Sequence, residues 1–364
     1  MRNKYKYTIK AVSEIDTKIY NMYQQLHDNT INLGDMSEIA DKQLHNIGKI
    51  THICCSVPCV DFSTAGRNQG CICTCNTCKK QFNPLHVQDW DNTCIYCGSI
   101  DIQRSTATLF SDFIRTVKQK RPYFVISENV KTLKRTQTFQ MLKEQLQLLG
   151  YNVYHTVFNA KDFGVPQNRE RLFIVAIRND KDMQRNFQFM QRQVHNNIQD
   201  YLLADEKVPE RYYLTDKQCT GGIEDTAFTL LCDNSTKRFS NKRTNTINCT
   251  DGRQRKLTPQ EYCRLQGFND KEFEKISNNA DYLIYRAVGN SIPVSVLLSV
   301  YADIFVYNPD LFKSLKVLSL CSGVGAYEAA LARLYRIITI CDGDTAKVQQ
   351  VVQSLLRQKQ YILF

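Results

Sequence analysis

One cysteine stands just after an apolar run, where it could act as a nucleophile. The run ITHICCS covers residues 50–56, and Pro58 and Cys59 follow it closely. Ligands of α/β folds bind at the carboxyl ends of the strands, so a strand here would carry Cys59 to that edge of the sheet. A thiolate in this place could attack an electrophilic carbon atom. The alternative is a buried structural cysteine, which is a common state of this residue.

A glutamate and two arginines occupy similar positions. The run YFVIS leads into Glu128, and Arg169 and Arg171 stand at the start of the run LFIVAI. A partly buried glutamate has a raised pKa and could hold or donate a proton near neutral pH. Strand residues two apart share a face, and paired guanidinium groups suit a phosphate or a carbonyl oxygen. Helix capping or an ion pair for Glu128, and surface ion pairs for the arginines, are the alternatives.

Four further cysteines have the spacing of a zinc ribbon. They form two Cys-x-x-Cys pairs on either side of KKQFNPLHVQDWDNT, namely Cys75, Cys78, Cys94 and Cys97. Two such pairs close a tetrahedral site for structural zinc. Cys71 and Cys73 are alternative ligands, whereas His86 fits a loop better than a ligand position. We expect the zinc to hold together an insert that is too small for a core of its own.

The composition is that of an ordinary globular protein, with 43% hydrophobic and 23% charged residues among 364. The N-terminal residues do not resemble a signal peptide, and no run resembles a membrane span. We therefore expect a cytoplasmic protein, in which the 15 cysteines are ligands, nucleophiles or core residues rather than disulfides. The net charge of +11 suits a polyanionic partner.

Short apolar runs alternate with helical patterns through most of the chain. This alternation predicts an α/β fold with a doubly wound sheet that is covered on both faces. It stops at residues 178–248, where the sequence is polar and irregular, and a smaller domain is expected there. It resumes with a helix that has Thr258 as its N-cap and Glu261 as the partner in a capping box.

A strand, a tight turn and a helix are also predicted near the C-terminus, at residues 315–335. The turn contains Gly323 and Gly325, which would let the backbone approach a ligand. Such a unit normally opens a nucleotide-binding sheet, but here it comes last. A plain strand-to-helix turn is the alternative.

Taken together, the motifs resemble those of the cytosine-C5 DNA methyltransferase family. They read PCVDFS, ENV, QNRERLF, LTPQEYCRLQGF, VGNSIPV and SLCSGVGAYEAAL, with SEID and LGD near the N-terminus. The resemblance implies methyl transfer from S-adenosylmethionine to C5 of a cytosine flipped out of double-stranded DNA, as in restriction-modification enzymes. Cys59 would add to the base, Glu128 would act at N3, Arg171 would hold O2, and Arg169 would support the same pocket.

The resemblance also implies where the cofactor binds. The C-terminal turn would cradle S-adenosylmethionine, Glu14 would bind the ribose hydroxyls, Asp35 would meet the adenine amino group, and Asn290 would lie near the methionine end. The full set of expected cofactor residues is Glu14, Ile15, Asp35, Met36, Pro58, Asn290, Ser291, Cys321, Ser322, Gly323, Gly325 and Tyr327.

The order of the motifs differs from that of the family, because the cofactor turn comes last. We expect a circular permutant, with YNPDLFKS bridging the old termini. The segment IITICDGDTAKVQQVV resembles SEIDTKIYNMYQQL, so Asp342 could compete with Glu14 for the ribose and Asp344 would lie on Asp16. Glu14 is preferred, because LGD follows it at family-like spacing. The tail could instead add an edge strand or exchange with another chain, although a monomer is expected.

The implied organisation has six parts. They are a first catalytic part (1–70), a zinc-ribbon insert (71–100), a second catalytic part (101–178), a target-recognition domain (179–250), returning helices (251–310), and the permuted cofactor unit with its tail (311–364). In the recognition domain, STKRFSNKRTNT offers Lys and Arg for phosphates and Asn and Thr for base edges. The ribbon could contact DNA beside the target. Methylation of tRNA and a DNA-binding module with a decayed active site remain the alternatives.

Overall fold

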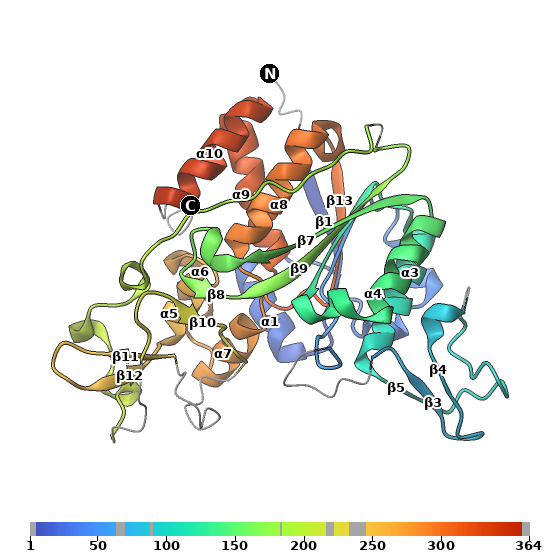
Figure 1. The fold of residues 1–364 in the computed structure, drawn as a ribbon, viewed down its shortest axis with the longest axis horizontal. Coiled ribbons are helices and arrows are strands. Elements are labelled where there is room, and N and C mark those ends of the chain that lie inside the picture. The colour runs from blue at the N-terminus through green and yellow to red at the C-terminus, as the bar shows by residue number, and fades with distance from the viewer. Residues whose placement is uncertain are drawn as a thin grey trace.

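The computed structural model describes residues 5–62, 70–87, 90–182, 184–215, 222–232 and 245–358. Its centre is a six-stranded sheet in the order β1-β13-β2-β6-β9-β7 (Figure 1). The strands are β1 (Tyr7–Ser13), β13 (Leu315–Leu320), β2 (His52–Cys55), β6 (Phe124–Val130), β9 (Glu170–Arg178) and β7 (Tyr151–Asn159). The first four run parallel, whereas β9 runs antiparallel to both β6 and β7. The predicted α/β fold is therefore confirmed as a mixed sheet.

Helices cover both faces of this sheet (Figure 1). One face packs against α3 (Leu109–Lys120) and α4 (Gln137–Leu148), through side chains such as Phe113 and Leu142. The other face packs against α1 (Thr17–Leu26), α8 (Val294–Tyr307) and α9 (Ala326–Ile340). Because both faces are covered, every residue of β2 is buried and the strand shows no alternation of apolar and polar positions.

The last strand of the chain lies inside the sheet. β13 pairs with β1 on one side and with β2 on the other, and Leu320 is opposite both Ser13 and Cys55. The segment Cys321–Gly325, here called the glycine turn, follows β13, and its Ser322 amide donates to the Ser13 carbonyl at 3.1 Å. The glycine turn therefore opens beside the loop after β2, which carries Cys59.

The tail forms two helices, α9 and α10 (Thr345–Gln358). The run IITI resembles a strand, yet Ile337 and Ile338 are buried in the last turns of α9 at helical spacing from Leu334. The expected similarity of the segment IITICDGDTAKVQQVV to SEIDTKIYNMYQQL is therefore wrong, because IITI ends a helix. Asp342 follows α9, about 20 Å along the helix from the glycine turn, and so lies far from the Glu14 position.

The tail also forms no edge strand in the part that the structure describes. Instead, α10 packs against α8 and α9, and its Val348, Val352 and Leu356 are buried in the same core. The Asn196 amide group donates to the Leu356 carbonyl at 3.2 Å, which ties the end of α10 to the region after β9.

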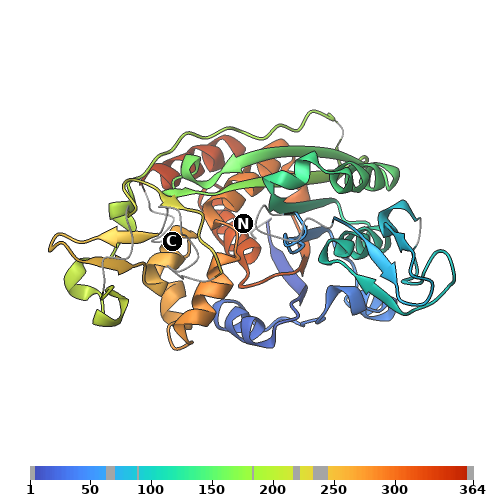
Figure 2. The ribbon, with the colours of Figure 1, turned by 60° about the horizontal axis from the view of Figure 1, so that its bottom comes forward.

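Two small units lie at opposite ends of the molecule (Figure 2). The cysteine-rich insert is a three-stranded sheet of β3 (Cys73–Cys75), β4 (Gln81–Phe82) and β5 (Ile102–Arg104), so it extends slightly beyond its expected end at residue 100. At the other end, a hairpin of β11 (Thr246–Asn248) and β12 (Gln254–Lys256) crosses the expected boundary at residue 250. Between the two units lie the glycine turn, α1 and α7 (Asp281–Gly289).

The hairpin is joined to the main body by a buried ion pair. Arg255 of β12 is fully buried and pairs with Glu261 of α5 (Pro259–Leu265) at 2.9 Å. Glu261 also completes the predicted capping box, because it accepts from the Thr258 amide at 2.7 Å while its own amide donates to the Thr258 hydroxyl at 3.2 Å. The sequence prediction of this helix start is confirmed.

The remaining elements are short. They are α2 (Asp41–Asn46), α6 (Asp270–Ile276), β8 (Gln167–Asn168), β10 (Ala227–Phe228) and 3-10 turns at Met36–Glu38, Pro84–His86, Thr106–Thr108, Lys131–Arg135, Ala160–Asp162, Ile198–Tyr201, Asp205–Lys207, Glu210–Tyr212 and Pro309–Phe312. The stretch Asp281–Tyr307, which contains α7 and α8, is apolar and long enough to cross a membrane, but 83% of its most apolar window is buried inside the protein.

Candidate active site

Cys59 lies in the loop after β2, and neighbouring groups fix this loop. The Asn129 amide group donates to the Val57 carbonyl at 2.8 Å, and the Phe62 amide closes a turn onto the Cys59 carbonyl at 2.9 Å. Asn129 belongs to β6, so the loop is tied to the strand that carries Glu128. Cys59 itself is half-buried.

Glu128 is buried at the carboxyl end of β6. Its Oε1 lies 3.2 Å from Nε of Arg171, which comes from the neighbouring strand β9. Burial raises the pKa of Glu128, and the charges of Arg171 and Arg169 oppose this rise only in part. The carboxyl therefore keeps a proton more readily than an exposed glutamate does.

Arg169 is also buried, but its guanidinium group contacts main-chain carbonyls. It donates to Leu230 at 2.9 Å, to Gly289 at 3.2 Å and to Ser291 at 2.8 Å. Burial, together with the charge of Arg171, lowers the pKa of Arg169 to about 9. Arg169 is thus a positioning residue that joins three segments, whereas Arg171 is the arginine that pairs with Glu128.

The environment of Cys59 favours the protonated thiol. Burial raises its pKa, the charge of Arg171 lowers it, and the charge of Glu128 raises it again. The thiol is therefore not activated in advance, and a group that stabilises the thiolate must act when the substrate is bound.

Glu14 meets the glycine turn. Its Oε2 accepts from the Gly323 amide at 2.9 Å, and its Oε1 accepts from the Asp16 amide at 3.0 Å. The Asn32 side chain accepts from the Glu14 amide at 3.0 Å and donates to the Glu14 carbonyl at 2.9 Å. Glu14 is therefore held rigidly between β1 and the turn, and burial raises its pKa.

The two glycines of the turn have different roles. Both have positive φ, 54° at Gly323 and 80° at Gly325. A Cβ atom at Gly325 would lie 2.2 Å from Nε2 of His27, so this glycine is required for close packing of α1. A Cβ atom at Gly323 would meet no atom within 4 Å, so this part of the turn faces open space, as a cofactor cradle requires.

Tyr327 connects the glycine turn to the loop of Cys59. Its hydroxyl lies 3.1 Å from the Ser56 hydroxyl and 3.4 Å from the Cys55 carbonyl. The Ser56 hydroxyl also lowers the pKa of Glu128. Sequence reasoning missed Ser56, although its place just after β2 was the signal that could have found it.

The other expected cofactor residues line the same edge of the sheet. Asp35 caps the 3-10 turn at Met36 by accepting from the Ser37 amide at 2.8 Å, and Sγ of Cys321 lies 3.8 Å from Sδ of Met36. Ile15 is 71% exposed beside Glu14, which leaves an apolar side chain at the rim.

The end of α7 approaches this edge as well. Arg286 of α7 pairs with Asp16 at 2.6 Å, and α7 leads directly into exposed Asn290 and buried Ser291. Pro58 is exposed in the loop of Cys59. The structure thus gathers the expected cofactor residues around one edge, whereas Asp342 does not reach it.

The four cysteines of the insert converge. Their sulfur atoms all lie within 4.8 Å of one another, and the pairs Cys75–Cys97 and Cys78–Cys94 are each 3.6 Å apart. A tetrahedral Zn–S distance of about 2.3 Å requires S–S edges of about 3.8 Å, so the set fits zinc. Cys71 and Cys73 lie outside this group, and His86 is exposed.

Comparisons with known proteins show the family to which the chain belongs. The family model for C-5 cytosine-specific DNA methylases matches residues 2–77, 96–226 and 224–306. The type II methyltransferase M2.ScrFI of Lactococcus lactis subsp. cremoris is 29% identical over 293 residues, which cover 75% of this chain and 71% of the relative. The type II methyltransferase M.NlaX of Neisseria lactamica is 31% identical over 312 residues, with 79% and 85% covered.

Solved structures support the fold. A DNMT2 variant of Spodoptera frugiperda superimposes with a TM-score of 0.59 at 16% identity, over 82% of this chain and 92% of that chain. The S. pombe Dnmt2 methyltransferase gives a TM-score of 0.58 at 17% identity, over 82% and 92%. With the family model matching most of the sequence, the chain belongs to the C-5 cytosine-specific DNA methylases.

Proposed function

We propose that this DNA cytosine-5-methyltransferase works by covalent addition of the Cys59 thiolate to C6 of a cytosine flipped out of duplex DNA. The observation that carries the proposal is the junction of three segments, with Cys59 after β2, Glu128 on β6 and Arg171 on β9, held together by the Glu128–Arg171 pair at 3.2 Å. The family model and the type II relatives support the reaction class.

In this mechanism, the Cys59 thiol first gives its proton to water, and its Sγ then forms a bond to C6 while the ring gains negative charge. A proton held by Glu128 meets N3, and burial raises the pKa of that carboxyl, so that it holds a proton more readily than an exposed glutamate does. Arg171 stabilises the charge at O2. After C5 is methylated, its proton leaves to water, the Sγ–C6 bond breaks, N3 returns its proton to Glu128, and the thiolate of Cys59 is restored.

When bound, S-adenosylmethionine supplies the methyl group. The residues present fit this cofactor, because the turn at Gly323 faces open space and the buried Ser322 hydroxyl has no hydrogen-bond partner among the described residues. Glu14 would bind the ribose hydroxyls, Asp35 the adenine amino group, and Asn290 the methionine end. An acidic residue on ribose follows the general rule for nucleotide sites.

Duplex DNA is the proposed partner of a monomer. Flipping the target costs about a few kcal/mol, which contacts to the backbone must supply, and the net charge of +11 suits this task. The target-recognition region, expected at residues 179–250, would recognise the DNA sequence around the target. Residues 235–244 of its basic run STKRFSNKRTNT (235–246) lie outside the described residues.

The insert is proposed to bind one structural zinc ion through Cys75, Cys78, Cys94 and Cys97. It is docked on the main body, where the Gln145 amide group donates to the Leu85 carbonyl at 3.1 Å. The family match leaves out residues 78–95, which supports an insertion at this point. Because the ribbon follows the loop of Cys59, we also propose that it contacts DNA beside the target, an idea that fails if a ribbon deletion leaves DNA affinity and sequence preference unchanged.

We further propose that the chain is a circular permutant of its family. Two observations support this origin: the last strand, β13, lies between β1 and β2, and the family match ends at residue 306, before that strand. The linker YNPDLFKS would then join the two ends of the unpermuted chain.

The decisive experiment traps the covalent intermediate. Wild type and Cys59→Ser are incubated with plasmid-derived duplex DNA containing 5-fluorocytosine, or with tRNA containing it, in the presence of S-adenosylmethionine. A denaturant-stable adduct on DNA with wild type alone is expected. Trapping on tRNA only would favour the RNA activity, and no adduct on either substrate would indicate a decayed site.

A further inference from the structure

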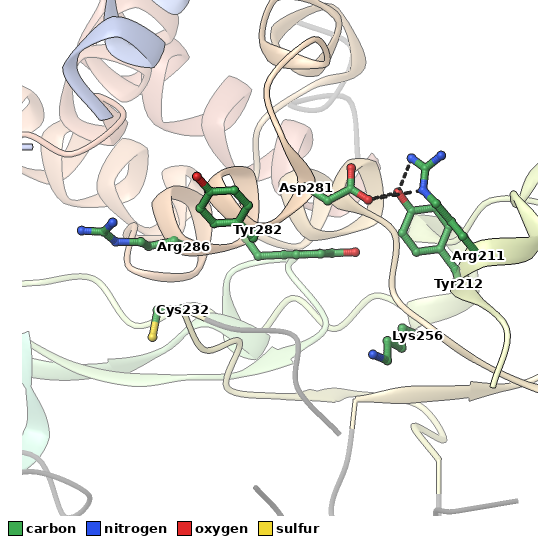
Figure 3. A pocket seen from close by; sticks show the side chains of 8 residues that line it. Arg211, Tyr212, Cys232, Lys256, Asp281, Tyr282 and Arg286 are labelled. Atoms are coloured by element: carbon green, nitrogen blue, oxygen red, sulfur yellow. Dashed lines mark hydrogen bonds and ion pairs between the residues drawn. The ribbon is translucent and has the colours of Figure 1, made fainter. Parts of the chain in front are cut away.

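A cavity of about 400 Å³ lies between α7 and the β11–β12 hairpin (Figure 3). Its walls include Arg211, Tyr212, Lys256, Tyr282, Tyr285 and Arg286. None of the residues assigned above to the thiol chemistry or to the cofactor lines it. Its size falls within the range of about 300–1,000 Å³ that is usual for ligand pockets.

Two segments that line the cavity also accept hydrogen bonds from Arg169. Cys232, on one wall, is two residues beyond Leu230, whose carbonyl accepts from Arg169. Arg286, on another wall, belongs to α7, and the Gly289 carbonyl of that helix also accepts from Arg169. A Cβ atom at Gly289 would lie 2.0 Å from the Leu231 carbonyl oxygen, so the two walls are in close contact. Two segments that line the cavity are therefore tied to Arg169, whose charge acts on Glu128 and Cys59.

The charged side chains of the cavity differ in whether they have a partner within the protein. Figure 3 shows that the Arg211 guanidinium group donates to the Tyr212 hydroxyl at 2.9 Å, and that this hydroxyl donates to Asp281 at 2.6 Å. Asp281 is thereby occupied. Asp281 also forms an ion pair with Arg211 at 3.4 Å. Among the described residues, Lys256 has no ion pair, and Tyr282 is 61% exposed.

We propose that this cavity holds one nucleotide of the DNA strand beside the flipped cytosine. The inference rests on the proposed function and extends it to a substrate contact outside the base pocket. Tyr282 offers a ring face on which any base can stack, Lys256 offers a cation for a phosphate, and Arg286 offers another, since only part of its guanidinium group is used by Asp16.

The test compares variants of these residues in the full chain. The probe is a duplex that carries the site methylated by wild type on plasmid DNA, as mapped by bisulfite sequencing. Tyr282→Ala is expected to weaken duplex binding about five- to fifty-fold, while Tyr282→Phe keeps the ring and binds like wild type. Lys256→Gln is expected to reduce the slope of log affinity against log salt by about one unit.

Matched controls are Ile340→Ala, which removes another apolar side chain that is 66% exposed, and Lys316→Gln, which removes an exposed cation at the amino end of β13. Both are expected to bind the duplex like wild type. Thermal unfolding is measured for every variant, and binding is compared among variants that are as stable as wild type. Unchanged binding by Tyr282→Ala overturns the proposal, and so does a loss shared with the controls. Trapping of wild type on 5-fluorocytosine DNA would show separately that the proposed covalent mechanism is correct even if this cavity does not bind DNA.

Discussion

Cysteine side chains occupy two contrasting environments in this chain. Cys59 is half-buried beside Glu128 and Arg171, and burial raises the pKa of its thiol. In the ribbon, by contrast, four sulfur atoms lie within 4.8 Å of one another, an arrangement that fits the proposed zinc ion. The comparison teaches that the neighbours of a cysteine, rather than its exposure alone, decide between a nucleophile and a ligand.

The largest effect is expected when the cation beside Cys59 is removed, because this tests whether the neighbours of the thiol determine its reactivity. Arg171→Gln leaves Glu128 buried without its 3.2 Å partner and withdraws the charge that lowers the pKa of the thiol. We expect adduct formation on 5-fluorocytosine DNA to slow about 10²- to 10³-fold. Arg171→Lys keeps the charge but loses the planar fork, so an intermediate rate is expected. Equal rates for both variants and wild type would show that Arg171 plays no part.

The pH dependence of the thiols sharpens the contrast further. Because the pKa of Cys59 is raised above its usual value of 9.0, the thiolate is a minor species at neutral pH, and its fraction grows about tenfold for each pH unit. Alkylation of Cys59 by iodoacetamide, followed by peptide mass spectrometry, should rise in this way from pH 6 to pH 8. The zinc-bound thiols should stay unreacted throughout. A flat profile at Cys59 would contradict a raised pKa.

Loss of one ribbon sulfur should disrupt the insert without disrupting the main body. Cys78→Ser is expected to lower the zinc content from about one ion per chain to near zero and to speed hydrogen exchange in β3, β4 and β5. β2 and β13 should keep their protection. Cys71→Ser is the matched control, since Cys71 is buried in the core cluster and lies outside the group of four. Loss of zinc in the control but not in Cys78→Ser would overturn the ligand assignment.

The smallest effect is expected at Glu328, a second buried acid. Among the described residues, it has no ion pair like the one between Glu128 and Arg171. Glu328, in the first turn of α9, is buried, and among the described residues its carboxyl oxygens have no hydrogen-bond partner, although Ser319 and Tyr23 lie near enough to lower its pKa slightly. Burial raises the pKa of Glu328 to about 7. The protonated acid is therefore tolerated at low pH, and stability is lost as the pH rises from about 4.5, the usual pKa of a glutamate, to about 7.

Glu328→Gln removes this titration. We expect the variant to unfold in urea with the same free energy as wild type near pH 4, and to be more stable by about 3 kcal/mol near pH 8.5. Thr339→Val, at the far end of α9, serves as a control that leaves the pH dependence unchanged. A wild-type advantage at the higher pH would show that Glu328 is ionised and paired in the folded state.

The sequence predicted the parts of the site that follow strand ends. Cys59, Glu128 and the glycine turn each come directly after an apolar run, so their common edge could be inferred from local pattern alone. The partners of Arg169 could not be inferred in this way, because its carbonyl acceptors at Leu230 and Gly289 come from distant segments. The tail shows the opposite error, since its local similarity to the segment with Glu14 suggested a second ribose ligand, whereas Ile337 and Ile338 are buried in the last turns of α9, which carry Asp342 away from the glycine turn.

The position of β13 has a consequence for synthesis of the protein. β1 and β2 emerge from the ribosome early, yet the strand that joins them is the last of the sheet to be made. At roughly 5–20 residues per second, the apolar edges of both strands wait for tens of seconds before β13 arrives. We therefore expect the nascent chain to be prone to aggregation until β13 is made. A chain truncated before residue 315 would lack both the glycine turn and a central strand of the sheet. Premature termination should thus yield an insoluble product rather than a partly active enzyme.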